Sequence, residues 1–166
     1  YNTALYDYEL LNILAPYKDF VGVIMRDELG ELLDRMADEK RKKFGFIINT
    51  DTSEGEGEHW QAVYVDLVDT KQVGFYDSFG KPMHPDSLRL LKAWVSKRVP
   101  YYIKYKTNRV VQQASNSNRC GWHSARFLIT MFKTGNYEMA TDYDSIRQGE
   151  GSAKDLEEKY KKFGYI

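Results

Sequence analysis

The stretch HWQAVYVDL, from His59 to Leu67, is followed after the turn residues VDTK by QVGFYDSFG, from Gln72 to Gly80. Both stretches are rich in β-branched and aromatic residues and are bounded by turn-forming residues, which is typical of β-strands. A connection as short as VDTK can join neighbouring antiparallel strands. We therefore predict a β-hairpin, in which the first residue of one strand lies close to the last residue of the next.

The sequence on the N-terminal side of this hairpin predicts two helices and two further strands. Apolar residues recur at helical spacing in TALYDYELLNILAP (residues 3–16) and in DELGELLDRMADEKRKK (residues 27–43). Between them lies FVGVIM (residues 20–25), a short apolar run of strand type. FGFIINT (residues 44–50) predicts another strand, which the acidic loop DTSEGEGE separates from the hairpin.

The sequence after the hairpin predicts a helix, a strand and a second helix. PDSLRLLKAWVSKRV (residues 85–99) opens with a proline and an acidic residue, as helices often do. YYIKYKT (residues 101–107) returns to the alternation of a strand. CGWHSARFLITMFKTG (residues 120–135) is apolar around most of its circumference, which predicts a buried helix that ends near Gly135.

The tail predicts a loop followed by a terminal helix. NYEMATDYDSIRQGEG (residues 136–151) is polar and is expected to be rich in loops, and SAKDLEEKYKKF (residues 152–163) reads as a helix capped by Ser152. Helices around a mixed, mainly antiparallel central sheet, without regular βαβ alternation, predict an α+β fold. Since there are no repeats or linkers, we expect a single domain over residues 1–166.

The composition argues against several classes of function. Twenty-four basic and twenty-four acidic residues give a formal net charge of zero, so no general attraction to nucleic acid or anionic lipid is expected. One cysteine cannot form an internal disulfide or a thiolate zinc cluster, and no signal peptide or long apolar run is visible. We therefore expect a soluble protein of a reducing compartment. Its thirteen tyrosines fit ordinary packing or a groove that holds an extended peptide.

The single cysteine, Cys120, stands at the expected start of a helix, after the polar run Ser-Asn-Ser-Asn. The thiolate is the nucleophilic form, and a helix N-terminus and a neighbouring imidazole both stabilise it. Gly121 would let a backbone N–H approach a reacting carbonyl. A cysteine at this position is also explained as a small core residue. The position alone is compatible with either role.

A cysteine hydrolase also needs a base, and the chain has three histidines. His59 opens the hairpin and Asp77 closes it, so the carboxylate could orient the imidazole. Asp77 is alternatively a turn residue, because Asp-Ser before Phe-Gly is favourable turn chemistry. His84 lies in a proline-bracketed loop and is expected to be exposed, whereas His123, three residues past Cys120, is expected to pack as an ordinary side chain.

The stretch Gln113-Ala-Ser-Asn116-Ser117-Asn-Arg-Cys120-Gly121 resembles the motif Gln-Gly-Pro-Asn-Ser-x-x-Cys-Gly. That motif belongs to the cysteine proteases that group the adenovirus-type (adenain-like) maturation proteases with the SUMO-deconjugating proteases. HW, YDSFG, and DFVGVIM further upstream resemble other segments of this family, so the likeness covers residues 19 to 130. The short chain and the pattern CGxHxxxFL resemble most the maturation proteases of virophages and polinton-type elements.

The resemblance implies a papain-like or adenain-like core and a role for each matching residue. Cys120 would be the nucleophile, His59 its base, Asp77 the acid that orients the base, and Gln113 the side-chain donor of the oxyanion hole. The neighbouring Gln112 is a rival for that last role, although its spacing to the cysteine is one residue too long. The resemblance also implies that three further residues contact the substrate or cover the imidazole: Trp60, Gly121 and Asn116. Trp60 is alternatively a core tryptophan on an inward-facing position of its strand.

The function implied by the resemblance is cleavage of viral capsid or core precursor proteins near glycine during particle maturation. The enzyme would act as a monomer in the virion and in the host-cell cytoplasm, with no metal or organic cofactor and no membrane. Two alternatives stay open. One is deconjugation of a ubiquitin-like modifier by the same residues, and the other is an acyltransferase or a catalytically silent module that only holds a peptide.

Overall fold

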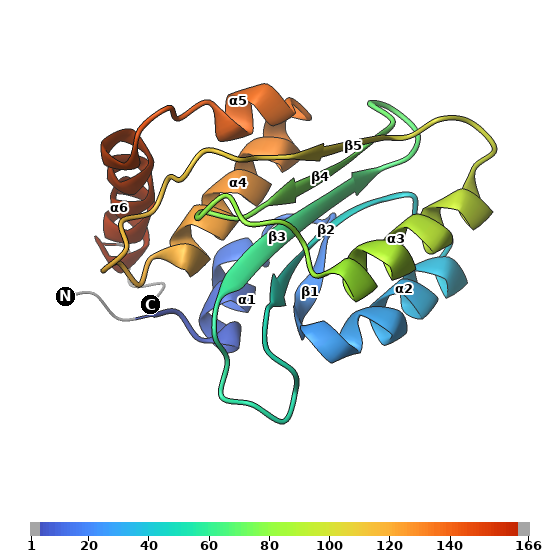
Figure 1. The fold of residues 1–166 in the computed structure, drawn as a ribbon, viewed down its shortest axis with the longest axis horizontal. Coiled ribbons are helices and arrows are strands. Elements are labelled where there is room, and N and C mark those ends of the chain that lie inside the picture. Colours follow the sequence, from blue (N-terminus) through green and yellow to red (C-terminus); the bar gives the residue numbers. More distant parts are fainter. Residues whose placement is uncertain (1–3, 163–166) are drawn as a thin grey trace.

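Alternate residues of strand β3 (Trp60–Asp66) pack on opposite faces of the central sheet in the computed structural model, which describes residues 4–162 (Figure 1). Ala62 and Tyr64 belong to one apolar core, whereas Val63 and Val65 belong to the other. Every residue of the strand is buried. This burial explains why HWQAVYVDL is almost continuously apolar, since a strand covered on both faces cannot show polar alternation.

The sheet has five strands in the order β1-β2-β3-β4-β5. The three central strands pair antiparallel, and each edge strand runs parallel to its neighbour. The predicted hairpin and the mixed α+β fold are therefore confirmed, with the antiparallel pairing confined to the centre. The remaining strands are β1 (Phe20–Met25), β2 (Lys43–Asn49), β4 (Gln72–Tyr76) and β5 (Lys104–Thr107).

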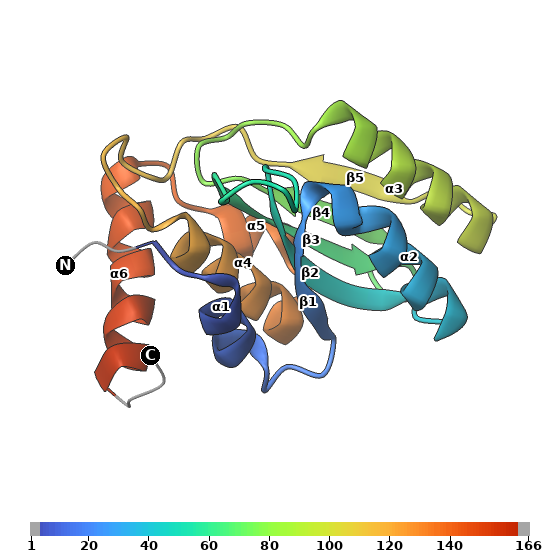
Figure 2. The same ribbon diagram turned by 90° about the horizontal axis from the view of Figure 1, so that it is seen from below.

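Helices cover both faces of the sheet, and the sheet separates two apolar cores (Figures 1 and 2). On one face lie α1 (Asp7–Leu14), α4 (Cys120–Thr134), α5 (Tyr137–Thr141) and α6 (Ile146–Lys162). On the other lie α2 (Leu29–Asp38), which follows the 3-10 turn η1 (Arg26–Glu28), and α3 (Pro85–Arg98).

Most helix ends follow the local signals in the sequence. Helix α1 ends before Pro16, and α3 begins at Pro85 with His84 at its N-cap. Helix α4 ends before Gly135, whose φ of 64° lies in the left-handed region that favours glycine. Within residues 4–162, no helix is both long and apolar enough to span a bilayer.

The tail differs from its sequence prediction, because α5 and the first part of α6 lie within residues 136–151. Asn136 caps α5 by accepting from the backbone N–H of Met139, and α6 starts at Ile146. Ser152 is therefore inside α6, where its hydroxyl contacts the Tyr143 hydroxyl, and the expected cap is wrong. The polar, glycine-containing sequence lowers the local helix propensity. Packing against α4 compensates, through a buried stripe that local sequence does not reveal: Gly149, Ala153, Glu157 and Tyr160.

Two glycines of α6 give a matched test of how closely this helix packs on the backbone of Gln112. A Cβ at Gly149 would lie 2.5 Å from the carbonyl oxygen of Gln112, whereas a Cβ at Gly151 would meet nothing within 4 Å. Alanine normally stabilises a helix interior relative to glycine by about 0.5–1 kcal/mol, which we expect for Gly151→Ala. We expect Gly149→Ala to destabilise the fold by about 1–3 kcal/mol, because the clash is with backbone. Urea unfolding of both variants measures the difference, and equal stabilities would contradict the packing described here.

Candidate active site

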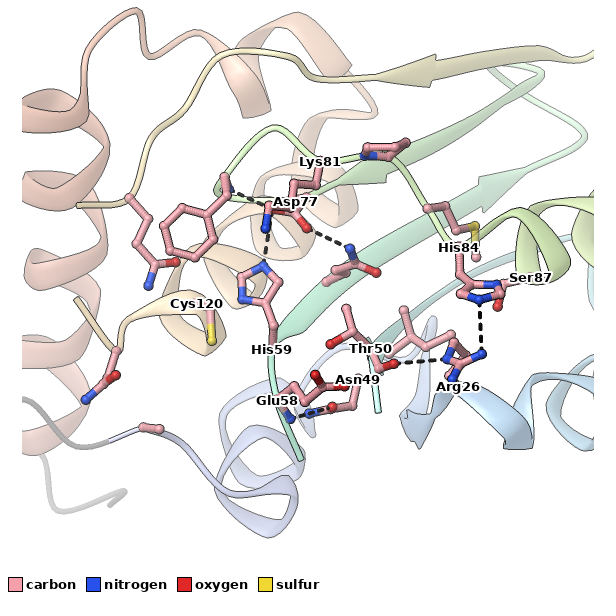
Figure 3. A pocket seen from close by; sticks show the side chains of 18 of the residues that line it. Arg26, Asn49, Thr50, Glu58, His59, Asp77, Lys81, His84, Ser87 and Cys120 are labelled. Carbon is pink, nitrogen blue, oxygen red and sulfur yellow. Dashed lines mark hydrogen bonds and ion pairs between the residues drawn. The ribbon is translucent and has the colours of Figure 1, made fainter. Parts of the chain in front are cut away.

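The ends of β3 and β4 bring His59 and Asp77 together. Ala62 pairs with Tyr76 across the two strands, so residues just before β3 lie next to residues just after β4. His59 precedes β3 and Asp77 follows β4, and the imidazole Nε2 lies 3.2 Å from the carboxylate Oδ1 (Figure 3). The hairpin therefore places the predicted base beside the predicted acid.

Asp77 is fully buried, and several donors hold its carboxylate. Gln61 donates from Nε2 to Oδ2 at 2.6 Å, and the backbone N–H of Phe79 donates to Oδ1 at 2.7 Å. Asn108 fixes the backbone of Asp77, since its amide accepts from the Asp77 N–H and donates to the Asp77 carbonyl. Burial is the largest influence and raises the pKa of Asp77, but these donors and the charge of His59 outweigh it, so the pKa is lowered.

The imidazole of His59 lies between Asp77 and Cys120. Its Nε2 faces the carboxylate, which leaves Nδ1 as the nitrogen that can exchange a proton with the thiol. Burial is again the largest single influence and lowers the pKa of His59. The hydrogen bond to Asp77 and the interaction with the Cys120 side chain together outweigh burial and raise the pKa from 6.5 to about 9.

Cys120 is the first residue of α4 and is 7% exposed. Its sulfur lies beside the imidazole of His59 and faces a cleft of about 530 Å³ (Figure 3). A second cleft of similar volume adjoins the first and shares Cys120, Asn49 and Glu58 with it. The dipole of α4 stabilises a negative charge at this position. The two clefts therefore meet at the thiol, and together they are called the groove below.

The side chain of Gln113 lines the same cleft, whereas that of Gln112 is used elsewhere. Gln112 is fully buried, and its amide binds Tyr76, Arg126 and two backbone carbonyls under α5. Gln113 accepts from Ser78 Oγ and donates from Nε2 to the Ser117 carbonyl at 2.7 Å. Because an amide nitrogen carries two hydrogens, one N–H of Gln113 stays available to the cleft.

A buried polar cluster holds the loop between Gln113 and Cys120, and the sequence did not reveal it. Glu150 of α6 accepts from Ser117 Oγ at 3.2 Å and contacts His123 Nε2 at 2.6 Å. Arg119, directly before the cysteine, pairs with Glu150 and Glu157. His123 is thus a packed side chain, as expected, and burial lowers its pKa. Helix α6 therefore anchors the loop that precedes the thiol.

Trp60 is buried and donates from Nε1 to the Leu5 carbonyl at 2.8 Å, which fits the interpretation as a core tryptophan. It also lines the second cleft. The aromatic ring against the His59 imidazole is that of Phe79, at 5.1 Å between ring centres, and the sequence had shown Phe79 only as a turn residue. Phe79 therefore covers one side of the imidazole, and a covering role for Trp60 stays a prediction.

Gly121 and Asn116 lie in different surroundings. A Cβ at Gly121 would lie 3.1 Å from Leu5 and 3.3 Å from Trp60, so the glycine permits close packing of the N-terminal segment. Asn116 is exposed, and it is Ser115, Ser117 and Asn118 of its loop that line the first cleft. Contact of Gly121 and Asn116 with a substrate stays a prediction. Within the described residues, no group of three or more His, Cys, Asp or Glu side chains is placed to hold a metal ion.

The sequence is similar to viral cysteine proteases. It is 23% identical over 137 residues to the SUMO-1 cysteine protease of African swine fever virus, a match that covers 81% of this chain and 50% of the viral protein. The chain thus spans about half the length of the curated relatives it matches. No protein-family model matches the chain.

Solved proteases share the fold. The crystal structure of the African swine fever virus protease matches with a TM-score of 0.70 and 17% identity, over 92% of this chain and 66% of that one. ChlaDub1 from Chlamydia trachomatis gives 0.66 and 15%, over 95% and 92%. The C-terminal Ulp1 protease domain, in complex with the yeast ortholog of SUMO, gives 0.50 and 16%, over 92% and 76%. The chain therefore has the fold of these proteins, while the closer likeness to adenovirus-type and virophage enzymes stays a prediction.

The contact between His59 and Asp77 predicts an alkaline titration of the imidazole. In NMR titrations we expect the wild-type His59 to lose its proton near pH 9, and Asp77→Asn to lower that pKa because the compensating charge is gone. The folded pKa lies above the ordinary value, so the protonated imidazole stabilises the fold fully below pH 6.5 and loses that contribution as the pH rises through about 9. A wild-type pKa near 6.5 would contradict the arrangement.

Proposed function

We propose that this chain is a cysteine endopeptidase in which Cys120 is the nucleophile, His59 the base and Asp77 the acid that orients the base. The observation that carries the proposal is the 3.2 Å contact between His59 and Asp77, in the cleft that also exposes the only cysteine of the chain. The likeness to viral cysteine proteases supports it.

The proposed reaction proceeds through an acyl-enzyme. The sulfur of Cys120 attacks a peptide carbonyl while Nδ1 of His59 holds the thiol proton, and that proton then passes to the leaving amine. Water next attacks the thioester, His59 takes a proton from the water, and the thiol is restored as the acid product leaves. Asp77 keeps the imidazole oriented and stabilises its charged form throughout.

The oxyanion of each tetrahedral intermediate needs donors that are already in place. The N–H of Cys120 lies in the first turn of α4, where no intrahelical carbonyl is available to it. The second N–H of the Gln113 amide is a neutral donor, which stabilises an oxyanion without neutralising the thiolate. We propose these two groups as the oxyanion hole. Gln112 is unsuited, because Tyr76, Arg126 and backbone carbonyls occupy its side chain.

We further propose that the substrates are viral capsid or core precursor proteins, cleaved near glycine during particle maturation in the virion and the host-cell cytoplasm. Support comes from the viral origin of the sequence relatives. A glycine in the substrate also suits a site in which the nucleophile is only 7% exposed, since a residue without a Cβ lets the backbone approach.

A second candidate is deconjugation of a ubiquitin-like modifier by the same residues. The name of the viral relative, a SUMO-1 cysteine protease, and the likeness to a Ulp1 domain in complex with a SUMO ortholog favour it. Fluorogenic conjugates of such modifiers separate the two functions. Cleavage of a conjugate but of no glycine-containing capsid-precursor peptide would establish deconjugation instead.

Substitutions at the site test the proposed chemistry on a glycine-containing precursor peptide. We expect Cys120→Ala to abolish cleavage, and Gln113→Ala to lower kcat by about a hundredfold because one oxyanion donor is lost. Gln148→Ala is the matched control, since Gln148 is an exposed amide on α6, and it should keep the wild-type rate. Mass spectrometry of the two product peptides identifies the cleaved bond. Continued cleavage by Cys120→Ala would refute the assignment of Cys120 as the nucleophile.

Thiol labelling separates an enzyme from a catalytically silent peptide-binding module. Because Cys120 is the only cysteine, the mass added by iodoacetamide reports on that residue alone. We expect fast labelling at neutral pH in the wild type and labelling slower by about tenfold or more in His59→Ala, where the imidazolium no longer stabilises the thiolate. Failure of the wild type to label would support the silent module.

A further inference from the structure

The end of the first cleft away from Cys120 is lined by basic and hydroxyl side chains from two separate elements. Arg26 of η1, His84 at the N-cap of α3 and Ser87 in the first turn of α3 gather there, whereas Lys81 lines the same cleft closer to Asp77 (Figure 3). Arg26 is held in place by donating from Nε to the Thr50 carbonyl at 2.9 Å. This end is called the distal pocket below.

Both ring nitrogens of His84 in the distal pocket face N–H donors. His84 Nδ1 accepts from the backbone N–H of Asp86 at 3.1 Å, and His84 Nε2 lies 3.2 Å from Nη1 of Arg26. A neutral imidazole has one acceptor nitrogen, and here both ring nitrogens face donors. With Nδ1 as the acceptor, Nε2 carries a hydrogen and points it toward the guanidinium. An acceptor oxygen beside the two nitrogens, on the cleft side, would accept from both Arg26 and His84.

Nearby carboxylates do not supply that oxygen. Asp27 accepts from the backbone and hydroxyl of Ser53, and Asp86 pairs with Arg89 at 2.9 Å. Asp86 Oδ2 also lies 4.0 Å from Nδ1 of His84, which is the ring nitrogen away from Arg26. Neither aspartate lines the cleft. The acidic side chains that do line it are Asp77, which is bound to His59, and Glu58, which lies at the junction with the second cleft.

Ser87 adds a further donor to the distal pocket, and Lys81 adds positive charge elsewhere in the same cleft. Ser87 is 5% exposed and lines the cleft, and within residues 4–162 its hydroxyl makes no hydrogen bond. Lys81 is exposed at the same cleft and takes part in no ion pair of the described chain. The N-terminus of α3 adds the positive end of its dipole. Together these groups match an anion with several acceptor oxygens.

We propose that the distal pocket binds the carboxylate of an acidic side chain in the substrate, so that Arg26, His84 and Ser87 determine specificity for Asp or Glu at one position away from the cleaved bond. This rests on the proposed function, since the distal pocket shares its cleft with Cys120. The second cleft has the opposite character, because its charged lining is acidic: Asp7, Glu28, Glu56 and Glu58. The preference for an acidic residue is therefore confined to one side of the cleaved bond.

Binding to a Cys120→Ala protein tests the distal pocket without any need for cleavage. Acetylated and amidated glycine-containing peptides carry Glu or Gln at each position in turn, so that the side chain is the only source of a carboxylate. At one position we expect the Glu peptide to bind tighter than the Gln peptide by about tenfold, as for a charge-assisted hydrogen bond. Adding Arg26→Gln should remove the difference. Absence of a preference at every position, or its survival in Arg26→Gln, would overturn the proposal.

Two further variants control for charge and folding. Arg147→Gln removes an exposed arginine of α6 outside the cleft, so it changes net charge equally and should keep the preference for Glu. Ser87→Ala removes one hydroxyl and should reduce the preference several-fold even if Arg26→Gln fails to fold. If the Ser87→Ala variant and the Arg26→Lys variant both kept the full preference for the Glu peptide over the Gln peptide, this result would count against the distal pocket.

A cleavage assay on the wild-type protein with the same peptides keeps the two proposals apart. If the wild type cleaves no peptide although the Cys120→Ala protein prefers Glu through Arg26, the protease function fails and the distal pocket stands. If cleavage occurs and is insensitive to Glu at every position, the protease function stands and the distal pocket fails. We expect kcat/KM to be higher for the Glu peptide at the same position that the binding assay identifies.

Discussion

The antiparallel pairing of β3 with β4 is the constraint on which the arrangement of the site depends. Ala62 and Tyr76 form the terminal pair between β3 and β4, and Gln61 and Asp77 lie just beyond it. Nε2 of Gln61 donates to Oδ2 of Asp77 at 2.6 Å. A shift by one residue would turn every side chain of the strand to the other face. Both faces are apolar cores here, so a shift would bury the Asp77 carboxylate without its donors, at a cost of several kcal/mol.

The cysteine reaches this pair because α4 lies directly on the sheet. A Cβ at Gly45 of β2 would fall 2.8 Å from the ring of Phe132, so the missing side chain lets the helix approach closely. At the other end of the helix, the Ser124 hydroxyl donates to the Trp60 carbonyl at 3.2 Å. These contacts fix α4 along β3, with its first residue at the strand end that carries His59. The thiol is thus positioned by packing rather than by a flexible loop.

Local patterns in the sequence predicted most of the fold and the meeting of His59 with Asp77 near Cys120, whereas Gln113 was predicted only from the family resemblance. The hairpin, the helix after His84 and the helix that starts at Cys120 depend on turn residues and on apolar spacing, which the sequence displays directly. The sequence did not predict the roles of Phe79, Asn108 and Glu150, because these roles arise from contacts with residues distant in the chain. The start of α6 was not predicted for the same reason, since its packing on α4 outweighs the low helix propensity of its glycines.

The groove is lined by residues from the helices on both faces of the sheet. Cys120 belongs to a helix on one face of the sheet, while Arg26 and Ser87 belong to elements on the other, and His59 lies at the strand end between them. A peptide in the groove would therefore contact both layers at once. The buried core fixes the reacting groups, whereas loops and the first turns of helices at the rim carry most charges of the two clefts. Substitutions at the rim can change which peptide is chosen while the geometry at Cys120 stays the same.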